Sequence, residues 1–358
     1  MKNFPQGYFP CGLSSRLFCL VATQKISIDE KLTLESGASL QPVEIAYCTY
    51  GTLNKQRDNV VWICHALTAN ADVQDWWSGM VGSGKLFDPE RFFIVCANIL
   101  GSPYGTTSPL TINPFTGKPY GSDFPLITIR DIVAVHQLLA RHLQINQIAL
   151  LTGGSLGGQQ ALEWAIMQPS FIKRLVLIAT NARHSAWGIA FNEAQRMAIE
   201  SGGEEGIKAA RAIAMLSYRN YQMYADTQTD DQDKIDNFKA SSYQRYQGEK
   251  LAKRFDSQCY VVLSKAMDSH HVGRGRGSLE SALSSIKAQT LIIGISTDIL
   301  FPLQEQKFLS ENIPTAHLSV IHSKYGHDGF LLEYEQITQV ISERFPEFSI
   351  SYKHSLSQ

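Results

Sequence analysis

The sequence has little charge and almost no excess of either sign. Charged residues make up 18% of its 358 residues, compared with about 25% in an average globular protein. Lys and Arg together number 32, Asp and Glu number 33, and the net charge is −1. Nucleic acids and anionic membranes attract proteins with a pronounced basic patch or excess, so both kinds of partner are disfavoured.

Long apolar runs and paired cysteines are also missing. No run approaches the roughly 18 apolar residues of a membrane-spanning helix, and the apolar run at 17–22 is too short for a typical export signal. The six cysteines contain no C-x-x-C pair, and several lie inside apolar runs, which indicates reduced thiols in the cytoplasm. No cluster with metal-ligand spacing is apparent, and we expect neither a metal nor a cofactor.

Short apolar runs rich in β-branched residues recur between helical patterns. The clearest lie at residues 60–64, 92–97, 148–152, 175–179, 290–295 and 318–321. Such runs are typical of parallel strands that helices cover on both faces. A helix beginning near Thr128, with Asp131 completing a capping box, fits between the second and third runs. The order predicts an α/β fold with a mostly parallel, doubly wound sheet.

The strand signal stops between residues 183 and 285, where the sequence becomes polar, helical in pattern and rich in Tyr, Gln and Arg. It resumes at residue 290. We therefore expect a helical cap at 183–285, inserted into a core formed by residues 1–182 and 286–358. Within the cap, the carboxylate-rich stretch 226–236 is typical of a solvated loop.

Ser155 is the candidate nucleophile. It lies in the run Gly153-Gly154-Ser155-Leu156-Gly157, between a predicted strand and a predicted helix. This is the G-x-S-x-G pattern, in which the turn is so tight that only glycine fits at the flanking positions. Chance matches to the pattern are common, and the alternative is a glycine-rich structural turn. The strand-turn-helix context favours a serine hydroxyl held at the positive end of a helix.

A nucleophilic serine needs a base, and the base needs a partner that fixes its tautomer. In a sheet of this kind these groups follow the serine in the chain and lie just beyond strand ends. Asp298 and His327 each follow a predicted strand in this way. We assign Asp298 as the orienting acid and His327 as the general base; the alternatives are a helix cap and a surface histidine.

An oxyanion formed at the attacked carbonyl needs preorganised donors. The backbone N–H of Leu156, one residue after the nucleophile, is the first candidate. The second should come from the turn after the strand at 60–64, where we choose Leu67. The alternative for Leu67 is a core side chain.

Taken with their neighbours, these residues resemble the homoserine O-acetyltransferase family of α/β-hydrolase-fold acyltransferases, which serve methionine biosynthesis. The matching stretches are 50–54, 65–68, 113–114, 116–121, 124–125, 128–131, 161–164, 182–185, 190–193, 246–248, 254–256, 273–277 and 325–328. They extend over roughly residues 45 to 335. G-x-S-x-G alone indicates only an α/β hydrolase, whereas this ensemble is far more specific.

The resemblance implies a ping-pong acyl transfer. Ser155 would take an acetyl group from acetyl-CoA, a co-substrate, and the side-chain hydroxyl of L-homoserine would then attack the acetyl-enzyme. By the family's pattern Arg219 would hold the amino acid's carboxylate and Asp328 its ammonium group; the alternatives are a surface arginine and a helix cap. The resemblance also implies a cytoplasmic homodimer joined through the cap helices.

Two stretches depart from the family's pattern. Ala69-Asn70-Ala71-Asp72 replaces a Gly followed by an acidic residue, and Gly101-Ser102-Pro103-Tyr104 replaces a stretch richer in glycine. Because of these two departures, the sequence does not decide which acyl group is transferred. The basic run at 273–277 has the wrong spacing for a dinucleotide fingerprint; it is a structural loop of the cap or a contact for CoA phosphates.

Three alternatives therefore stay open. A succinyl donor or a serine acceptor would use the same residues, because one methylene changes binding by only about 1–3 kcal/mol. A serine esterase or thioesterase would also have the same triad, with water as the second nucleophile. A non-catalytic binding protein of this fold is disfavoured, since all three triad members are present.

Overall fold

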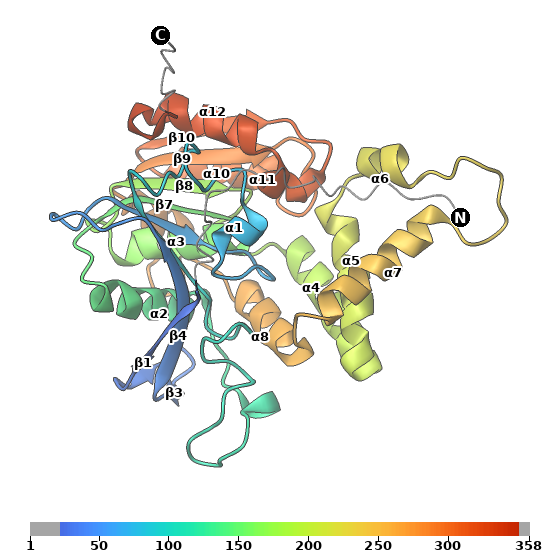
Figure 1. Cartoon of the computed structure of the whole chain (residues 1–358), viewed down its shortest axis with the longest axis horizontal. Coiled ribbons are helices and arrows are strands. Elements are labelled where there is room, and N and C mark those ends of the chain that lie inside the picture. Colours follow the sequence, from blue (N-terminus) through green and yellow to red (C-terminus); the bar gives the residue numbers. More distant parts are fainter. Residues whose placement is uncertain (1–21, 351–358) are drawn as a thin grey trace, which may run out of the picture.

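The computed structural model describes residues 22–350 (Figure 1). Cys11, Cys19 and most of the apolar run at 17–22 lie outside these residues. An eight-stranded sheet with the order β1-β4-β6-β5-β7-β8-β9-β10 forms the centre. Its strands are β1 (Gln24–Ile28), β4 (Val43–Tyr50), β5 (Val60–Cys64), β6 (Phe93–Ala97), β7 (Ile148–Gly154), β8 (Arg174–Ile178), β9 (Gln289–Ile295) and β10 (Ala316–Ile321).

The predicted α/β fold is confirmed, because the six strands from β5 to β10 are parallel and coincide with the six predicted runs. The sequence reading missed β1 and β4, which pair antiparallel at one edge. It also missed the small sheet of β2 (Leu32–Thr33) and β3 (Ser39–Leu40). β1 is a polar edge strand, largely exposed, and its conformation is stabilised by pairing with β4.

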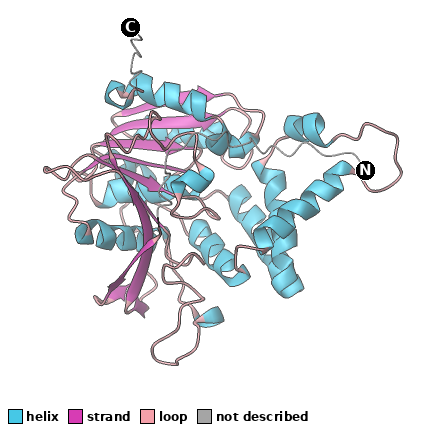
Figure 2. Ribbon diagram, viewed as in Figure 1, coloured by secondary structure: helices cyan, strands magenta, loops and turns pink. Residues whose placement is uncertain are grey.

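Helices cover both faces of the sheet (Figure 2). One apolar cluster joins the sheet to α2 (Ile129–His142), α3 (Leu156–Met167) and α10 (Leu303–Asn312). A second cluster on the other face includes residues of α1 (Val73–Trp76) and α12 (Tyr334–Arg344). The other short helices outside the segment between β8 and β9 are η1 (Gly121–Asp123), η3 (Gly326–Asp328), α11 (Gly329–Leu332) and η4 (Pro346–Phe348).

The predicted capping box at the start of α2 is present. The Thr128 side chain accepts a hydrogen bond from the Asp131 N–H, and the Asp131 carboxylate accepts one from the Thr128 N–H at 2.9 Å. The apolar residues of α2 are buried on one side of the helix, as expected for a helix packed against a sheet. None of the helices in the described part of the chain is long and apolar enough to cross a bilayer.

Between β8 and β9, the described chain forms helices that stand beside the sheet as a separate layer (Figure 1). They are α4 (Ala186–Gly202), η2 (Gly203–Glu205), α5 (Gly206–Tyr218), α6 (Tyr221–Gln228), α7 (Lys239–Ala252) and α8 (Ser257–Asp268). They are followed by α9 (Leu279–Ser284). We call the helices from α4 to α8 the cap.

The cap enters and leaves the core through a paired neck. The N–H of His184 donates to the carbonyl of His270 at 3.0 Å, and the N–H of Val272 donates to the carbonyl of Ala182 at 3.0 Å. The following helix, α9, packs on α10 of the core. The neck thus encloses the helices from α4 to α8, and α9 follows it in the chain.

Candidate active site

Ser155 lies at the sharp turn between β7 and α3, and its backbone has φ 57° and ψ −126°. A Cβ atom on Gly157 would lie 2.1 Å from the carbonyl oxygen of Cys64, and one on Gly153 would lie 2.3 Å from the backbone of Gly157. Real side chains do not fit at these distances. The two flanking glycines are therefore required by close backbone approach, and they hold Ser155 in a conformation that L-residues rarely adopt.

A cavity of about 360 Å³ opens above this turn. It is lined by Ser155, His327 and Asp328, and by residues 66–70 with Trp76. The cap contributes further lining residues, which include Arg211 and Tyr218. The structure thus brings together Ser155, Leu67, His327 and Asp328, four of the residues that the sequence singled out.

Asp298 lies directly behind His327. Its Oδ2 is 2.6 Å from Nδ1 of His327, and its Oδ1 accepts hydrogen bonds from the N–H groups of Leu300 and Phe301 at 2.8 and 2.9 Å. The Phe301 ring stacks on the imidazole, with centroids 5.0 Å apart. These contacts fix both the plane of the imidazole and the nitrogen that faces the carboxylate, which is the geometry of an acid that orients a base.

The second imidazole nitrogen of His327, Nε2, is buried and has no hydrogen-bond partner among the described residues. His327 and Ser155 line the same cavity, although no hydrogen bond joins these two described residues in this structure. Such bonds are often long in an unliganded site and tighten when substrate binds. Nε2 is thus the nitrogen available for proton transfer in the cavity.

The two residues predicted to supply oxyanion donors lie in the elements that the sequence indicated. Leu156 is the first residue of α3, where the N–H groups have no acceptor within the helix. Leu67 lines the cavity in the loop after β5. Its side chain is only 5% exposed and packs in the core. Leu67 is thus a core residue whose loop also borders the cavity.

The sequence analysis missed His65 as a support for this loop. The N–H of Ile99 donates to Nε2 of His65 at 3.1 Å, so Nδ1 carries the proton and donates to the carbonyl of Ala66 at 2.9 Å. Gln160 on α3 donates to the His65 carbonyl at 3.1 Å. Burial lowers the pKa of His65 to about 4, which keeps the imidazole neutral. His65 therefore links the Leu67 loop to α3.

Arg219, the predicted carboxylate anchor, is not among the residues that line the cavity. Its Nε atom forms an ion pair with Oδ2 of Asp328 at 3.0 Å, and its guanidinium lies over the Tyr325 ring at 5.5 Å. Both residues of the pair are largely buried. The predicted acceptor-binding residues Arg219 and Asp328 thus contact each other, and only Asp328 faces the cavity.

Arg211, which the sequence analysis did not select, does line the cavity. It lies on α5 two turns before Tyr218, and its guanidinium is 5.3 Å from the centre of the Tyr218 ring. Residues seven apart on a helix lie on the same face. The sequence analysis selected Arg219, which follows Tyr218 directly. The spacing of seven residues between Tyr218 and Arg211 is the signal that would have indicated Arg211.

The end of α5 packs directly against the loop that carries His327. Gly326 has φ 63°, and a Cβ atom on it would lie 3.1 Å from the carbonyl oxygen of Tyr218 and 3.1 Å from the carbonyl carbon of Arg219. A glycine is required here by both the backbone conformation and the lack of space. The position of the cap is therefore coupled to the position of the imidazole.

The basic loop at 273–277 has a structural role. Arg274 pairs with Glu35 through two nitrogens, at 2.9 and 2.8 Å, and Arg276 pairs with the buried Glu163 of α3. Arg130 of α2 pairs with both carboxylates. This network of three arginines and two glutamates ties α2 and α3 to the neck of the cap, and the loop's cations are already neutralised.

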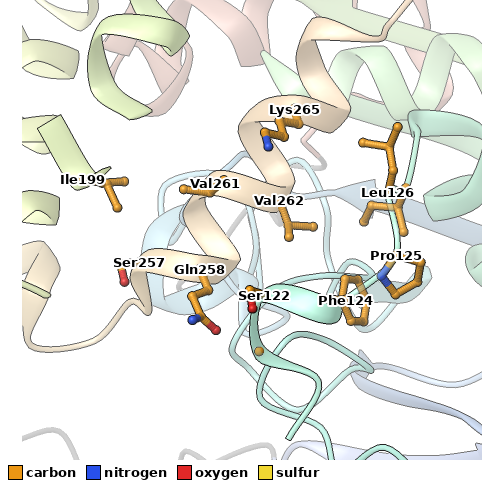
Figure 3. Close-up of a pocket in the computed structure, with 12 residues that line it drawn as sticks. Ser122, Phe124, Pro125, Leu126, Ile199, Ser257, Gln258, Val261, Val262 and Lys265 are labelled. Atoms are coloured by element: carbon orange, nitrogen blue, oxygen red, sulfur yellow. The ribbon is translucent and has the colours of Figure 1, made fainter. Parts of the chain in front are cut away.

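A separate cavity of about 280 Å³ lies between α8 and residues 121–127 (Figure 3). Its lining is mainly apolar, with Phe124, Val261 and Val262, and Lys265 lies at one side. None of the predicted site residues reaches it. Among the described residues, no group of three or more His, Cys, Asp or Glu side chains has the geometry of a metal site.

Comparison with known proteins gives concordant results. The family model of the α/β-hydrolase fold matches residues 59–334. The homoserine O-acetyltransferase of Cyclobacterium marinum is 47% identical over 94% of this chain and 99% of its own length. That of Chlorobaculum tepidum is 46% identical over 90% of this chain and 94% of its own.

Solved structures with the same architecture include two enzyme classes. Homoserine O-acetyltransferase from Bacillus anthracis has a TM-score of 0.81 and 25% identity, over 92% of this chain and 99% of its own. Esterase E22 has a TM-score of 0.83 and 25% identity, over 91% of this chain and 100% of its own. The fold therefore accommodates both transfer to an acceptor and hydrolysis.

Proposed function

This chain belongs to the homoserine O-acetyltransferase family of α/β-hydrolase-fold enzymes, and from that premise we propose that it acetylates the side-chain hydroxyl of L-homoserine with acetyl-CoA. The proposal is carried by one observation: the cavity that contains Ser155 and His327 also contains a cation, Arg211, and an anion, Asp328. An amino-acid acceptor is a zwitterion and needs both charges.

The first half of the reaction acetylates Ser155. As the serine oxygen attacks the thioester carbonyl, His327 takes its proton through Nε2, and Asp298 stabilises the imidazolium that forms. The N–H groups of Leu67 and Leu156 stabilise the negative charge on the carbonyl oxygen, each by about 2.7–4 kcal/mol. The carbon–sulfur bond then breaks, and the CoA thiolate leaves with the proton from His327.

The second half transfers the acetyl group to the acceptor. His327 takes the proton of the homoserine hydroxyl as that oxygen attacks the acetyl-Ser155 carbonyl, and the same donors stabilise the second oxyanion. Collapse of this intermediate breaks the bond to the serine oxygen, which regains its proton from His327. The products are O-acetylhomoserine and free enzyme, and the donor's thiol leaves before the acceptor reacts.

Acceptor recognition rests on Arg211 and Asp328. The planar guanidinium of Arg211 suits a carboxylate, because two of its N–H groups can donate in parallel. Asp328 adjoins His327 in the chain, so an ammonium group held there places the acceptor close to the reacting atoms. We assign Arg219 to hold the Asp328 carboxylate through their ion pair, in place of the direct substrate contact expected from the sequence.

Esterase activity is the second candidate, and the likeness to esterase E22 favours it. A transferase must let the acceptor react faster than water, which it achieves by positioning the acceptor and by excluding solvent. The cap wall with Arg211 and Tyr218 suits that task. We therefore expect slow thiol release from acetyl-CoA alone and fast release once homoserine is added.

That comparison is the test of the function. Thiol release that is fast without an acceptor and unaffected by homoserine would contradict transfer and support hydrolysis. Supplying mixed acetyl-CoA and succinyl-CoA with mixed homoserine and serine, followed by mass spectrometry of the products, resolves the donor and the acceptor. We expect O-acetylhomoserine to dominate; predominant O-succinylhomoserine or an O-acylserine would correct the substrate.

We also propose a homodimer joined through the cap. The exposed faces of α4 and α5 carry Met197 and Leu216, which are 57% and 55% exposed. Large apolar side chains on adjacent helices favour burial in an interface. Light scattering after size exclusion tests this: we expect twice the 39.9 kDa chain mass, and a monomer for Leu216→Glu. A monomeric wild type would contradict the dimer.

A further inference from the structure

The size of the catalytic cavity restricts how acetyl-CoA can bind. At about 360 Å³ the cavity is at the small end of ligand pockets, which range from about 300 to 1,000 Å³. The acetyl group with the end of the pantetheine arm, and then the acetyl group with the homoserine, must each fit this space. The adenosine and the three phosphate groups of the donor therefore lie outside the cavity, against the surface around its mouth.

Two cations of the cap lie at that mouth. Lys250 on α7 and Arg254, four residues later, both line the cavity, and both side chains are exposed. Arg254 follows the end of α7 at Ala252, so the two residues are close in the chain but do not belong to one helix. Both line the same cavity and both are exposed, so they place two positive charges at its opening.

The charge of both side chains is not neutralised within the described chain. No ion pair involves Lys250 or Arg254 among the described residues. Arg254 donates through Nη1 only to neutral groups, the carbonyl of Thr68 and the hydroxyl of Tyr104, both at 2.5 Å.

The carboxylates that line the cavity leave this excess intact. Asp75 also lines the cavity, and its charge raises the pKa of the Tyr104 hydroxyl that Arg254 contacts, but Asp75 forms no ion pair with Lys250 or Arg254 among the described residues. Asp328 is paired with Arg219. The mouth of the cavity on the cap side is therefore positively charged.

Other basic side chains near the cap are less suited to bind the phosphate groups of the donor. Arg274 and Arg276 are neutralised by Glu35 and Glu163 and do not line the catalytic cavity. Lys265 lies on the separate apolar cavity beside α8 (Figure 3). Lys253 lines a third cavity, of about 410 Å³, which shares Arg254 with the catalytic one.

We propose that Lys250 and Arg254 bind the phosphate groups of the acyl-CoA donor at the mouth of the catalytic cavity. This assignment rests on the proposed function and adds a donor subsite to it. Lys and Arg are the usual partners of phosphate oxygens, Lys as a point charge and Arg as a fork of N–H donors. Arg254 also holds the Thr68 carbonyl, which adjoins Leu67, so its donor contact is coupled to the oxyanion loop.

The experiment compares two donors that carry the same thioester. Acetyl-CoA has the nucleotide and its phosphates, whereas S-acetylpantetheine lacks them. We expect Lys250→Ala to raise the KM for acetyl-CoA about fivefold and Lys250→Glu about 30-fold, with the KM for S-acetylpantetheine changing less than twofold. Lys265→Ala is the matched control, an exposed cap lysine at the unrelated cavity, and its KM values should equal the wild type's.

Three results would overturn the assignment. An unchanged KM for acetyl-CoA in Lys250→Glu would remove the contact, and an equal rise for both donors would mean that the variant disturbs the shared part of the site. A rise in Lys253→Ala without one in Lys250→Ala would place the phosphates over the third cavity. Acetylation of homoserine from S-acetylpantetheine by the wild-type enzyme would support the proposed function whatever the variants show. A failure of the phosphate subsite can therefore be distinguished from a failure of the proposed function.

Discussion

The Nε atom of Arg219 lies 3.0 Å from the carboxylate of Asp328, the residue that follows His327 in the chain. This pair joins the C-terminal end of α5 to the short helix η3, and Gly326 packs against the same backbone. A contact between the cap and the histidine loop is thus built into the site. Arg219 itself does not line the cavity, whereas Arg211 of the same helix does.

The two arginines should therefore respond differently to substitution. We expect Arg211→Ala to raise the KM for homoserine about 30-fold, because it removes a charge-assisted contact with the acceptor's carboxylate. Arg219→Ala should raise that KM less than fivefold, since Arg219 acts through Asp328. Steady-state kinetics with varied homoserine measure both, and the reverse ranking would restore Arg219 as the direct anchor.

Asp298→Asn should lower kcat by about 10⁴ with little change in stability. The amide oxygen can still accept the N–H bonds of Leu300 and Phe301, but the amide nitrogen facing Nδ1 favours the wrong tautomer of His327. Asp88→Asn is the control, because Asp88 is likewise buried and accepts backbone N–H bonds from a turn. A comparable loss of kcat in that control would refute a specific role for Asp298.

Ser155→Gly should abolish activity and raise the free energy of unfolding by about 1 kcal/mol. A non-glycine residue at φ 57° and ψ −126° stores strain that glycine relieves, less the entropy cost of glycine in the unfolded chain. Denaturant unfolding of the wild type and the variant measures the difference. Loss of stability in Ser155→Gly would mean that the hydroxyl contributes more to the folded state than the turn costs.

Glu163→Gln should lower the free energy of unfolding by about 2 kcal/mol. Glu163 is 1% exposed and neutralises both Arg130 and Arg276, so its removal leaves two partly buried cations without that charge. Glu30→Gln is the control, because its ion pair with Arg141 is solvent-exposed and should contribute less than about 1 kcal/mol. Similar losses in both variants would argue against a special role for the buried network.

Glu35 should make part of the stability depend on pH. Partial burial raises its pKa, but hydrogen bonds from Arg274 and Thr128 and the charges of Arg130 and Arg274 outweigh this and lower it to about 2. A pKa lower in the folded than in the unfolded state gives stability that is full above about pH 4.5 and lost as the pH falls toward 2. The stability difference between wild type and Glu35→Gln should shrink over that window; a constant difference would contradict the pKa shift.

Local patterns in the sequence were enough for the six parallel strands, the capping box of α2 and the turn at Ser155. Each of these features depends on residues only a few positions apart. The strands follow from the pattern of apolar residues, the helix start from a capping box, and the turn from steric limits on the backbone. The edge strand β1 was missed because its residues are polar and its strand conformation comes from pairing with β4. The sequence pattern does not assign α9 to the cap or to the core, because a helix is expected in both, and its contact with α10 forms only in the folded chain.

The sequence by itself determined the fold, the sharp turn that carries Ser155 and the positions of Asp298 and His327 after strand ends, because glycine sterics and strand ends act locally. Only the tertiary structure decided which charges face the cavity. Arg211 lies within α5 and Arg219 caps its C-terminal end eight residues later, and local pattern does not distinguish their roles. Their directions depend on where Asp328, Tyr325 and the rest of the cavity lie, and those groups approach only when the chain folds.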